Sequence, residues 1–384
     1  MTASPSPAPG NQTPVEPARR IEPTEAIVWA DAARSAAFDG WLAGLAGTQR
    51  LRPETVRPAS ADASFRRYFR IDANDGTTRI VMDAPPDKED SAPFVKVAAL
   101  MREAGVTAPE VLDWDQRHGF LLLDDLGRRT MLDLIDPADA DASRPRYDEA
   151  IDALIRWQLA SRPDVLPPYD RALLERELAL FPQWYITQHR GMAVTGKLQE
   201  RLERSFKLIV DSNLASPSVY VHRDFMPRNL MVRDDEAGDS RGAPSVGTCL
   251  GVLDFQDAVY GPVTYDIASL LRDAFLSWDE EFVLDVTVRY WTAARKAKLP
   301  VDADFGAFYR AVEWMGLQRH LKVAGIFARL TLRDGKPKYL ADTPRFIAYI
   351  RATAARYMEL TPLLRVIDEV EGNSAASGFA YGRV

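Results

Sequence analysis

The chain has few of the side chains that form disulfides and metal clusters. Its 384 residues include one cysteine, Cys249, and four histidines. A single cysteine precludes an intrachain disulfide, and its place in an apolar segment predicts a small core residue rather than a nucleophile. These side chains show no paired spacing along the chain, so we do not expect a zinc site.

Long apolar runs and an excess of positive charge are also missing. No segment approaches the roughly 18 consecutive apolar residues of a membrane-spanning helix, so no membrane association is expected. The net charge of −7 disfavours broad nucleic-acid binding, because such binding relies on Lys and Arg to neutralise phosphates. Hydrophobic residues make up 46% of the chain and charged residues 27%, which is typical of soluble proteins. We expect a cytoplasmic monomer.

Three polar segments are predicted to lie outside the folded core. Residues 1–24 are rich in Pro and Ala and lack the charged start and apolar centre of a secretory signal, so a disordered tail is expected. Residues 371–384 are expected to fray. The Gly-rich segment 234–246 is predicted to be a mobile loop tip without a function of its own.

The main candidate functional motif lies in residues 219–232, which have the sequence VYVHRDFMPRNLMV. Apolar residues at both ends predict two short buried strands around a polar loop that carries His222, Asp224 and Asn229. An aspartate followed five positions later by an amide suits phosphoryl transfer, in which Asp orients a hydroxyl and Asn holds Mg²⁺. The apolar run 250–255 ends on Asp254, a natural second metal ligand. Taken alone, the loop could equally be a surface turn with an Asp cap.

The hydrophobic patterns predict an α+β fold with two lobes. A helix over 26–45, a hairpin over 64–83 with its turn at 74–76, a helix over 91–105 and strands over 110–115 and 119–123 form the first part. One more strand before Ser64 would complete a five-stranded antiparallel sheet. The predicted divisions are an N-lobe over 25–123, a hinge over 124–126 and a mainly helical C-lobe over 127–370. Helices in this C-lobe are predicted over 147–159, 198–210, 265–275, 281–297, 305–330 and 344–360.

The motif series HRDFMPRN, LDFQD and GPVTYDIASLL resembles the aminoglycoside and choline phosphotransferase superfamily, small-molecule kinases with a two-lobed protein-kinase-like fold. The segments DASFRRYFRI, VMDAPP and LLLDDLG further resemble the anomeric kinases of cell-wall amino sugars, which phosphorylate the C1 hydroxyl of N-acetylmuramate and N-acetylglucosamine in peptidoglycan recycling. The resemblance implies ATP and Mg²⁺ as cofactors and a small amino sugar as substrate. It implies that Asp224 is the catalytic aspartate and that Asn229 and Asp254 are the Mg²⁺ ligands.

Two further residues are predicted to support the loop. The resemblance implies that Asp266 is a buried carboxylate that braces the catalytic loop, although it could instead, or in addition, be the N-cap of the helix that follows. His222 is interpreted as a structural hydrogen bonder rather than a base, because Asp224 is better placed for that role. A hemiacetal hydroxyl is acidic for an alcohol, so an Asp224 pKa near its ordinary value would suffice.

The chain departs from the family where nucleotide phosphates are usually bound. The segment RIVMDAPP has no lysine at the expected position, and a glycine-rich phosphate loop is missing. Arg66, Arg67 or Arg70 could supply the positive charge, since a guanidinium binds phosphate oxygens in a bidentate fork; a solvated strand face is the alternative. Backbone groups from Asp124 to Leu126 are predicted to contact the base.

The predicted sugar contacts are less closely tied to a motif. Gln256 and Asp257 follow the metal ligand directly, and Trp184 or Trp314 could stack on a sugar ring, although large aromatics at helical positions are more often core. An acidic sugar also needs a cation for its carboxylate. The candidates for this cation remain open and are Arg223, Arg228, Lys322 and Arg329.

Two other functions remain open at this stage. A kinase that acts on an aminoglycoside or on choline would have the same fold but would need a carboxylate-rich cleft. A pseudokinase that binds nucleotide and serves as an interaction module would explain the missing lysine and glycine loop. The pseudokinase alternative has one argument against it: a chain that catalyses no reaction has no physical reason to keep Asp224, Asn229 and Asp254 beside buried strands.

Overall fold

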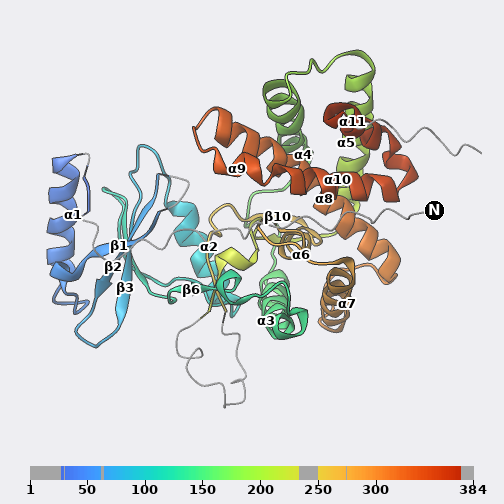
Figure 1. Cartoon of the computed structure of the whole chain (residues 1–384). Helices are drawn as coiled ribbons and strands as arrows, with labels where there is room; N and C mark the ends of the chain where they lie inside the picture. Colours follow the sequence, from blue (N-terminus) through green and yellow to red (C-terminus); the bar gives the residue numbers. More distant parts are fainter. Residues whose placement is uncertain (1–26, 30, 62–64, 233–249, 274, 373–384) are drawn as a thin grey trace, which may run out of the picture. The chain divides into compact units, whose positions relative to one another are not determined.

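The computed structural model describes residues 27–29, 31–61, 65–232, 250–273 and 275–372 (Figure 1). The predicted Pro/Ala-rich tail, the loop 234–246, Cys249 and the chain end beyond 372 lie outside these residues. The chain divides into two compact units between Asp125 and Leu126. The first unit holds the residues up to Ser91 together with Val111–Asp125, and the second holds Ala92–Glu110 together with the chain from Leu126 onward. The helix after Ser91, grouped with the N-lobe from sequence, thus falls in the second unit.

The first unit contains the predicted five-stranded antiparallel sheet. Its strands follow the order β1-β2-β3-β5-β4, and the strand expected before Ser64 is present as β1. The strands β2 and β3 form the predicted hairpin, whose turn uses Gly76 at φ +82, a conformation that glycine adopts without a steric penalty. The strand bounds are β1 Arg57–Ala61, β2 Arg67–Asp72, β3 Thr78–Asp83, β4 Val111–Asp115 and β5 Phe120–Asp124.

Helix α1 (Ala32–Leu45) packs its apolar side on this sheet. Phe38 and Leu42 of α1 contact a buried cluster that includes Phe69 of β2 and Phe120 of β5. The helix begins later than the sequence predicts, because the Asp31 side chain accepts a hydrogen bond from the Ala33 N–H (2.9 Å) and caps it there.

The second unit is mainly helical, as predicted, and each predicted helix is present. Helix α3 begins seven residues earlier than expected and carries Pro145 within it. The π-helical segment η3 and the helices α4, α9 and α11 were not predicted. The helix bounds are α2 Ala92–Glu103, α3 Ala140–Leu159, α4 Arg171–Leu178, η3 Phe181–His189, α5 Gly196–Ala215, α6 Tyr265–Leu271, α7 Glu280–Lys296, α8 Phe305–Leu332, α9 Lys338–Ala341, α10 Thr343–Arg356 and α11 Thr361–Glu371; short 3₁₀ turns are η1 Pro53–Thr55, η2 Leu132–Leu134, η4 Pro227–Asn229 and η6 Met358–Leu360.

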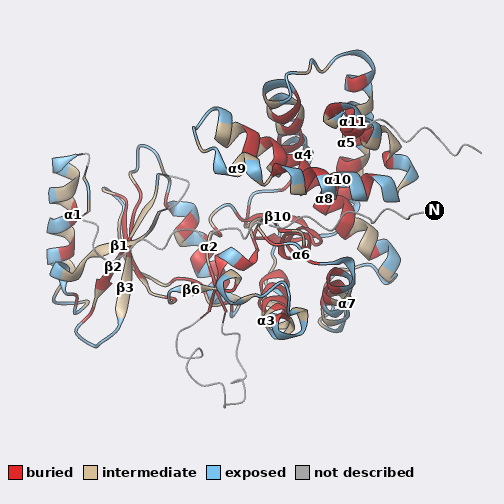
Figure 2. Ribbon diagram, viewed as in Figure 1, coloured by how far each residue is buried: buried red, intermediate tan, exposed pale blue. Residues whose placement is uncertain are grey.

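Two small antiparallel sheets lie among these helices. One pairs β7 (Ser218–Val221) with β10 (Val259–Pro262). The other has the order β6-β8-β9, with β6 at Arg129–Thr130, β8 at Leu230–Val232 and β9 at Leu250–Val252. Every residue of β8 and β9 is buried (Figure 2), so both strands are part of the core of the second unit.

Helix α8 is buried along most of its middle and packs against η3, α4, α5, α6 and α10. At Gly325 a Cβ would lie 2.5 Å from the backbone carbonyl of Leu180, so only glycine permits this close approach. Gly316 on the same helix has room, because the nearest atom to a Cβ there would be Arg272 Cγ at 3.9 Å. No helix among the described residues is both long and apolar enough to cross a bilayer.

These two glycines give a matched test of the packing of α8. We expect Gly325→Ala to lower the free energy of unfolding by about 1–3 kcal/mol, because the added methyl group meets rigid backbone. Gly316→Ala should leave it unchanged or raise it by up to about 1 kcal/mol, since Ala favours a helix over Gly. Urea unfolding of both variants measures the difference, and equal effects at the two positions would contradict this account of the contact.

Candidate active site

The polar loop predicted from the sequence connects the two small sheets. Strand β7 ends at Val221 and pairs with β10, whereas β8 begins at Leu230 and pairs with β6 and β9. The chain between them, residues 222–229, ends in the 3₁₀ turn η4. The predicted arrangement of two buried strands around a polar loop is therefore confirmed.

The buried carboxylate of Asp266 holds the beginning of this loop. The His222 N–H donates to Asp266 Oδ2 (2.7 Å), and the Arg223 N–H donates to Oδ1 (3.0 Å). Burial raises the pKa of Asp266 to about 7, while the two N–H donors and the charge of Arg319 oppose this rise. Because Thr264 is the N-cap of α6 and Asp266 lies inside the helix, the suggestion that Asp266 is that N-cap was wrong.

The ring of His222 joins the loop to the segment after β9. Its Nε2 lies 3.0 Å from the Leu253 carbonyl oxygen, and its Nδ1 accepts from the Asp224 N–H at 3.2 Å. A carbonyl can only accept and an amide N–H can only donate, so these partners assign the neutral tautomer with hydrogen on Nε2. Burial lowers the pKa of His222 to about 4. Both ring nitrogens are thus used in holding the loop.

The structure brings Asp224, Asn229 and Asp254 together. Asn229 Nδ2 donates to the backbone carbonyl of Asp224 (2.9 Å) and lies 3.3 Å from Asp254 Oδ2. The Leu253 N–H donates to the Asn229 carbonyl (2.9 Å), which ties the two segments. Asp254 adopts φ +63, a region that non-glycine residues rarely occupy and that is often found at functional sites.

Asp224 is partly exposed and lies among positive charges. Burial raises its pKa, but the charges of Lys322, Arg319 and Arg223 outweigh this effect and hold the pKa below its usual value. The carboxylate is therefore ionised at neutral pH, in keeping with the expectation that no raised pKa is needed.

The predicted sugar contacts are spread more widely. Gln256 Nε2 donates to Asp254 Oδ1 (2.9 Å), which places it at the centre of the site. Asp257 is exposed, and its backbone carbonyl accepts from Arg223 Nη1 (3.4 Å). Arg228 is also exposed, and its guanidinium lies over the ring of Phe275 at 4.6 Å.

The two tryptophans differ in their surroundings. Trp184 in η3 is partly exposed, and no hydrogen bond or ring contact joins it to the loop among the described residues. Trp314 is 2% exposed and packs edge-on against Tyr357. Trp314 is thus a core residue of α8, the alternative considered for it from sequence.

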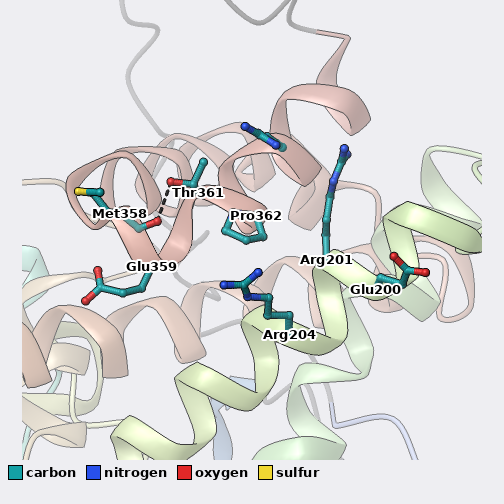
Figure 3. A pocket seen from close by; sticks show the side chains of 8 residues that line it. Glu200, Arg201, Arg204, Met358, Glu359, Thr361 and Pro362 are labelled. Atoms are coloured by element: carbon teal, nitrogen blue, oxygen red, sulfur yellow. Dashed lines mark hydrogen bonds between the residues drawn. The ribbon is translucent and has the colours of Figure 1, made fainter.

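A hollow of about 410 Å³ opens in the second unit between α5 and the chain from η6 into α11 (Figure 3). Three arginines contribute to its lining, but none of the predicted site residues does. The lining residues are Glu200, Arg201, Arg204, Met358, Glu359, Thr361, Pro362 and Arg365.

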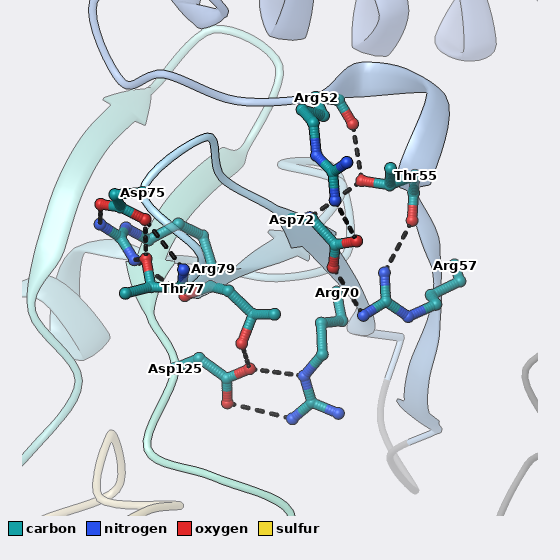
Figure 4. A network of polar contacts seen from close by, with 10 residues as sticks. Arg52, Thr55, Arg57, Arg70, Asp72, Asp75, Thr77, Arg79 and Asp125 are labelled. Carbon is teal, nitrogen blue, oxygen red and sulfur yellow. Dashed lines mark hydrogen bonds and ion pairs between the residues drawn. The ribbon is translucent and has the colours of Figure 1, made fainter.

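The arginines predicted to bind nucleotide phosphates lie in the first unit, where each faces a carboxylate. Arg70 donates through Nε and Nη2 to the two oxygens of Asp125 at 2.5 and 3.0 Å (Figure 4). Its side chain is only 12% exposed, so it does not lie on a solvated strand face.

The other two arginines are paired differently. Arg67 forms an ion pair with the fully buried Asp83 and lies over the ring of Trp29 at 4.2 Å. Arg66 Nε lies 3.9 Å from Glu89 Oε2, and its side chain is 11% exposed. The strand alternation predicted the two faces of β2 but not these carboxylate partners.

The residues predicted to contact the base lie at the boundary of the two units. Asp124 is the last residue of β5 in the first unit. Leu126, in the second unit, is 8% exposed, and its side chain packs on Gly251 of β9 so closely that a Cβ there would lie 2.7 Å from Leu126 Cδ1.

Two charged residues that the sequence analysis did not single out reach the loop. Arg319 of α8 donates through Nη1 to the Arg223 carbonyl (2.5 Å), and Glu177 of α4 forms ion pairs with Arg223 and Lys322. No local motif marks either residue. For Arg319 the one signal is its place in the largely apolar helix predicted over 305–330, where charged side chains are uncommon; for Glu177 there is none, because α4 was not predicted.

The chain is similar in sequence to known phosphotransferases. The model of the phosphotransferase enzyme family matches residues 55–300. The chain is 48% identical over 325 residues to an N-acetylmuramate/N-acetylglucosamine kinase of Neisseria meningitidis, covering 84% of this chain and 93% of that protein. It is 49% identical over 317 residues to the protein of the same name from Pseudomonas aeruginosa, covering 83% and 89%.

Solved structures support the fold. A putative aminoglycoside phosphotransferase from Ralstonia eutropha gives a TM-score of 0.55 at 12% identity, covering 87% of this chain and 98% of that chain. A Plasmodium vivax ethanolamine kinase gives 0.54 at 10% identity, covering 88% and 92%. The fold is thus the two-lobed protein-kinase-like α+β fold that the sequence predicts. Since the family model spans more than half of the chain and close relatives cover most of it, the chain belongs to the phosphotransferase enzyme family.

Proposed function

We propose that this phosphotransferase moves the γ-phosphoryl group of ATP to a hydroxyl of an N-acetyl amino sugar, N-acetylmuramate or N-acetylglucosamine, with the anomeric C1 hydroxyl as acceptor. Peptidoglycan recycling in the cytoplasm would supply such sugars. The proposal rests on the Asn229 amide, which contacts both the Asp224 backbone carbonyl and the Asp254 carboxylate. The chain that contains these contacts is nearly half identical to kinases named for these sugars.

Asp224 is the proposed catalytic base. Its ionised carboxylate would accept a hydrogen bond from the sugar hydroxyl and take its proton as the oxygen forms a bond to phosphorus and the bond from phosphorus to ADP breaks. A depressed pKa is compatible with this role, because the acceptor is a relatively acidic hemiacetal hydroxyl and the proton moves late.

Asn229 and Asp254 fit the site of a magnesium ion. Mg²⁺ prefers oxygen ligands and commonly takes one or two from protein, the rest from phosphates and water. The carboxylate of Asp254 and the amide of Asn229 are adjacent, and both close contacts of the amide use Nδ2, so Oδ1 is the atom proposed for the metal. When bound, the ion would neutralise charge on the phosphates.

The nucleotide is proposed to be held by the first unit and the hinge over 124–126. Arg66, Arg67 and Arg70 are the residues proposed to bind the phosphates, and each of them also lies near a carboxylate of the first unit. Backbone groups of Asp124 and Leu126 would contact the base.

Gln256 is the best-placed sugar contact, since it already touches Asp254. Asp257, Arg228 and Trp184 remain proposed contacts around it. Among the cations considered for the carboxylate of an acidic sugar, Arg223 and Lys322 are already paired with Glu177. The exposed Arg228 is therefore a better candidate than either, and the partly buried Arg329 of α8 also stays a candidate.

The substrate proposal is tested with a panel of acceptors and ATP consumption as readout. We expect turnover with N-acetylmuramate and N-acetylglucosamine and a ³¹P signal typical of an anomeric phosphate. Kanamycin and choline should give none. Phosphorylation of either cation without any of the amino sugars, or no turnover with any acceptor, would reject the proposal.

The role of Asp224 is tested with Asp224→Asn, which keeps the shape but removes the base. We expect kcat to fall by about 10²–10⁴-fold, while the Kd of ATP with Mg²⁺ stays within a few-fold of wild type. Asp211→Asn is the control and should keep full activity, because Asp211 is a partly exposed carboxylate on α5 that pairs with Lys207 and Arg171. A fully active Asp224→Asn enzyme would exclude Asp224 as the base.

The neutral, buried His222 makes stability depend on pH. As the pH falls from about 6.5, His222 of the unfolded chain takes up a proton, whereas the folded chain resists until about 4. Lowering the pH therefore favours unfolding, by up to about 3 kcal/mol from this residue. We expect the free energy of unfolding of His222→Gln to fall less between pH 6.5 and 4 than that of wild type. Parallel curves would show that His222 is not the source.

A further inference from the structure

A group of charged residues, three of them buried, lies around the start of the catalytic loop and has no direct part in the proposed phosphoryl transfer. We call Glu177, Arg223, Arg319 and Lys322 the loop-side ionic cluster. Glu177 and Arg319 are each 5% exposed and Lys322 is 9% exposed. Glu177 pairs with both Arg223 and Lys322, the latter at 3.1 Å, and its other oxygen accepts from the Tyr169 hydroxyl at 2.5 Å.

Stability alone does not explain this cluster. Removing charges from water is expensive, and replacing a buried ion pair with apolar side chains of similar volume is often neutral or stabilising. A cluster built from α4, α8 and the loop must therefore be explained by what it holds in place. Its contacts converge on one residue, Arg223.

Contacts to both its backbone and its side chain hold Arg223 in place. Its φ of +79 is disfavoured for a residue with a side chain, so surrounding contacts must offset the backbone strain. Its N–H donates to Asp266, its carbonyl accepts from Arg319 Nη1 at 2.5 Å, and its guanidinium pairs with Glu177.

The Arg319 contact acts on the peptide group that leads into Asp224. The carbonyl of Arg223 and the N–H of Asp224 belong to the same planar peptide unit. Arg319 fixes the oxygen end of this unit, and the His222 ring accepts from the nitrogen end. With both ends fixed, the direction in which the Asp224 side chain leaves the backbone is set.

Arg319 is itself held rigidly. Its guanidinium lies over the ring of Tyr265 at 4.7 Å, an arrangement that favours one orientation of the planar group. Lys322, three positions later on the same face of α8, approaches the hydroxyl of the same tyrosine at 3.4 Å. A lysine at position 319 would keep the charge but lose the planar fork that stacks and donates.

We propose that Arg319 and Glu177 are positioning residues of the phosphoryl-transfer site: Arg319 orients the peptide plane before Asp224, and Glu177 anchors the side chain of Arg223. The functional part of this inference rests on the proposed function.

The test uses the full chain and four variants: Arg319→Met, Arg319→Lys, Glu177→Gln and, as control, Arg310→Met. Arg310 is matched to Arg319 because it also lies on α8, stacks on an aromatic ring (Trp314, 4.5 Å) and has a polar partner, Glu359. The readouts are kcat, the KM of sugar and ATP, and amide hydrogen exchange of the peptide covering residues 219–229.

A positioning role predicts a split between the kinetic constants. We expect Arg319→Met to lower kcat by about 10–100-fold, since small misplacement of a catalytic group has effects of this order, with both KM values within threefold of wild type. Exchange of the loop amides should speed up at least tenfold, and that of α5 should not change. Arg319→Lys should recover part of kcat, Glu177→Gln should lower it about tenfold, and Arg310→Met should match wild type.

The outcomes separate this inference from the proposed function. Suppose that the wild type phosphorylates no amino sugar, but that loop amides still exchange faster in the variants. This result would support the positioning role and reject the proposed function. An active wild type whose Arg319→Lys and Glu177→Gln variants keep its kcat and loop exchange would overturn the positioning role alone. If Arg319→Met does not fold, these two conservative variants decide by the same criteria.

Discussion

The pair of hydrogen bonds from the His222 and Arg223 N–H groups to Asp266 is the interaction on which the candidate active site depends. These donors belong to consecutive residues, and a single carboxylate can accept both only when the backbone turns sharply. The turn places Arg223 in a left-handed conformation, and the chain then runs through Asp224 into η4. A buried acid near the start of one helix therefore decides where a side chain in a different segment points.

The parts of this arrangement that could be predicted from the sequence are those that depend on patterns among residues close together along the chain. Apolar residues on both sides of His222 and Asp224 indicate the buried strands. The spacing of five residues from Asp224 to Asn229 brings the Asn229 amide into contact with the backbone carbonyl of Asp224. The antiparallel sheet was equally predictable, because the alternation along β2 and the turn at Gly76 are local signals.

What could not be predicted depends on contacts between distant segments. The partners of Arg67 and Arg70 are Asp83 and Asp125, and strand alternation indicates the face of a side chain but not the charge across from it. Likewise, Glu177 and Arg319 are separated from the loop by tens of residues, so nothing near them in the sequence connects them to it. Some helix ends were predicted incorrectly for a related reason. A single capping side chain, such as Asp31 before α1, sets where the helix begins even when the apolar pattern extends beyond it.

The close approach of Gly325 to Leu180 has a consequence for how the length of this protein can change. Gly325 and Arg319 are six positions apart on one continuous helix, and both must face fixed neighbours. Inserting or deleting one residue between them would turn one relative to the other by about 100°, so that either the glycine would leave the carbonyl or the guanidinium would leave the loop. The interval from 319 to 325 should thus keep a constant number of residues.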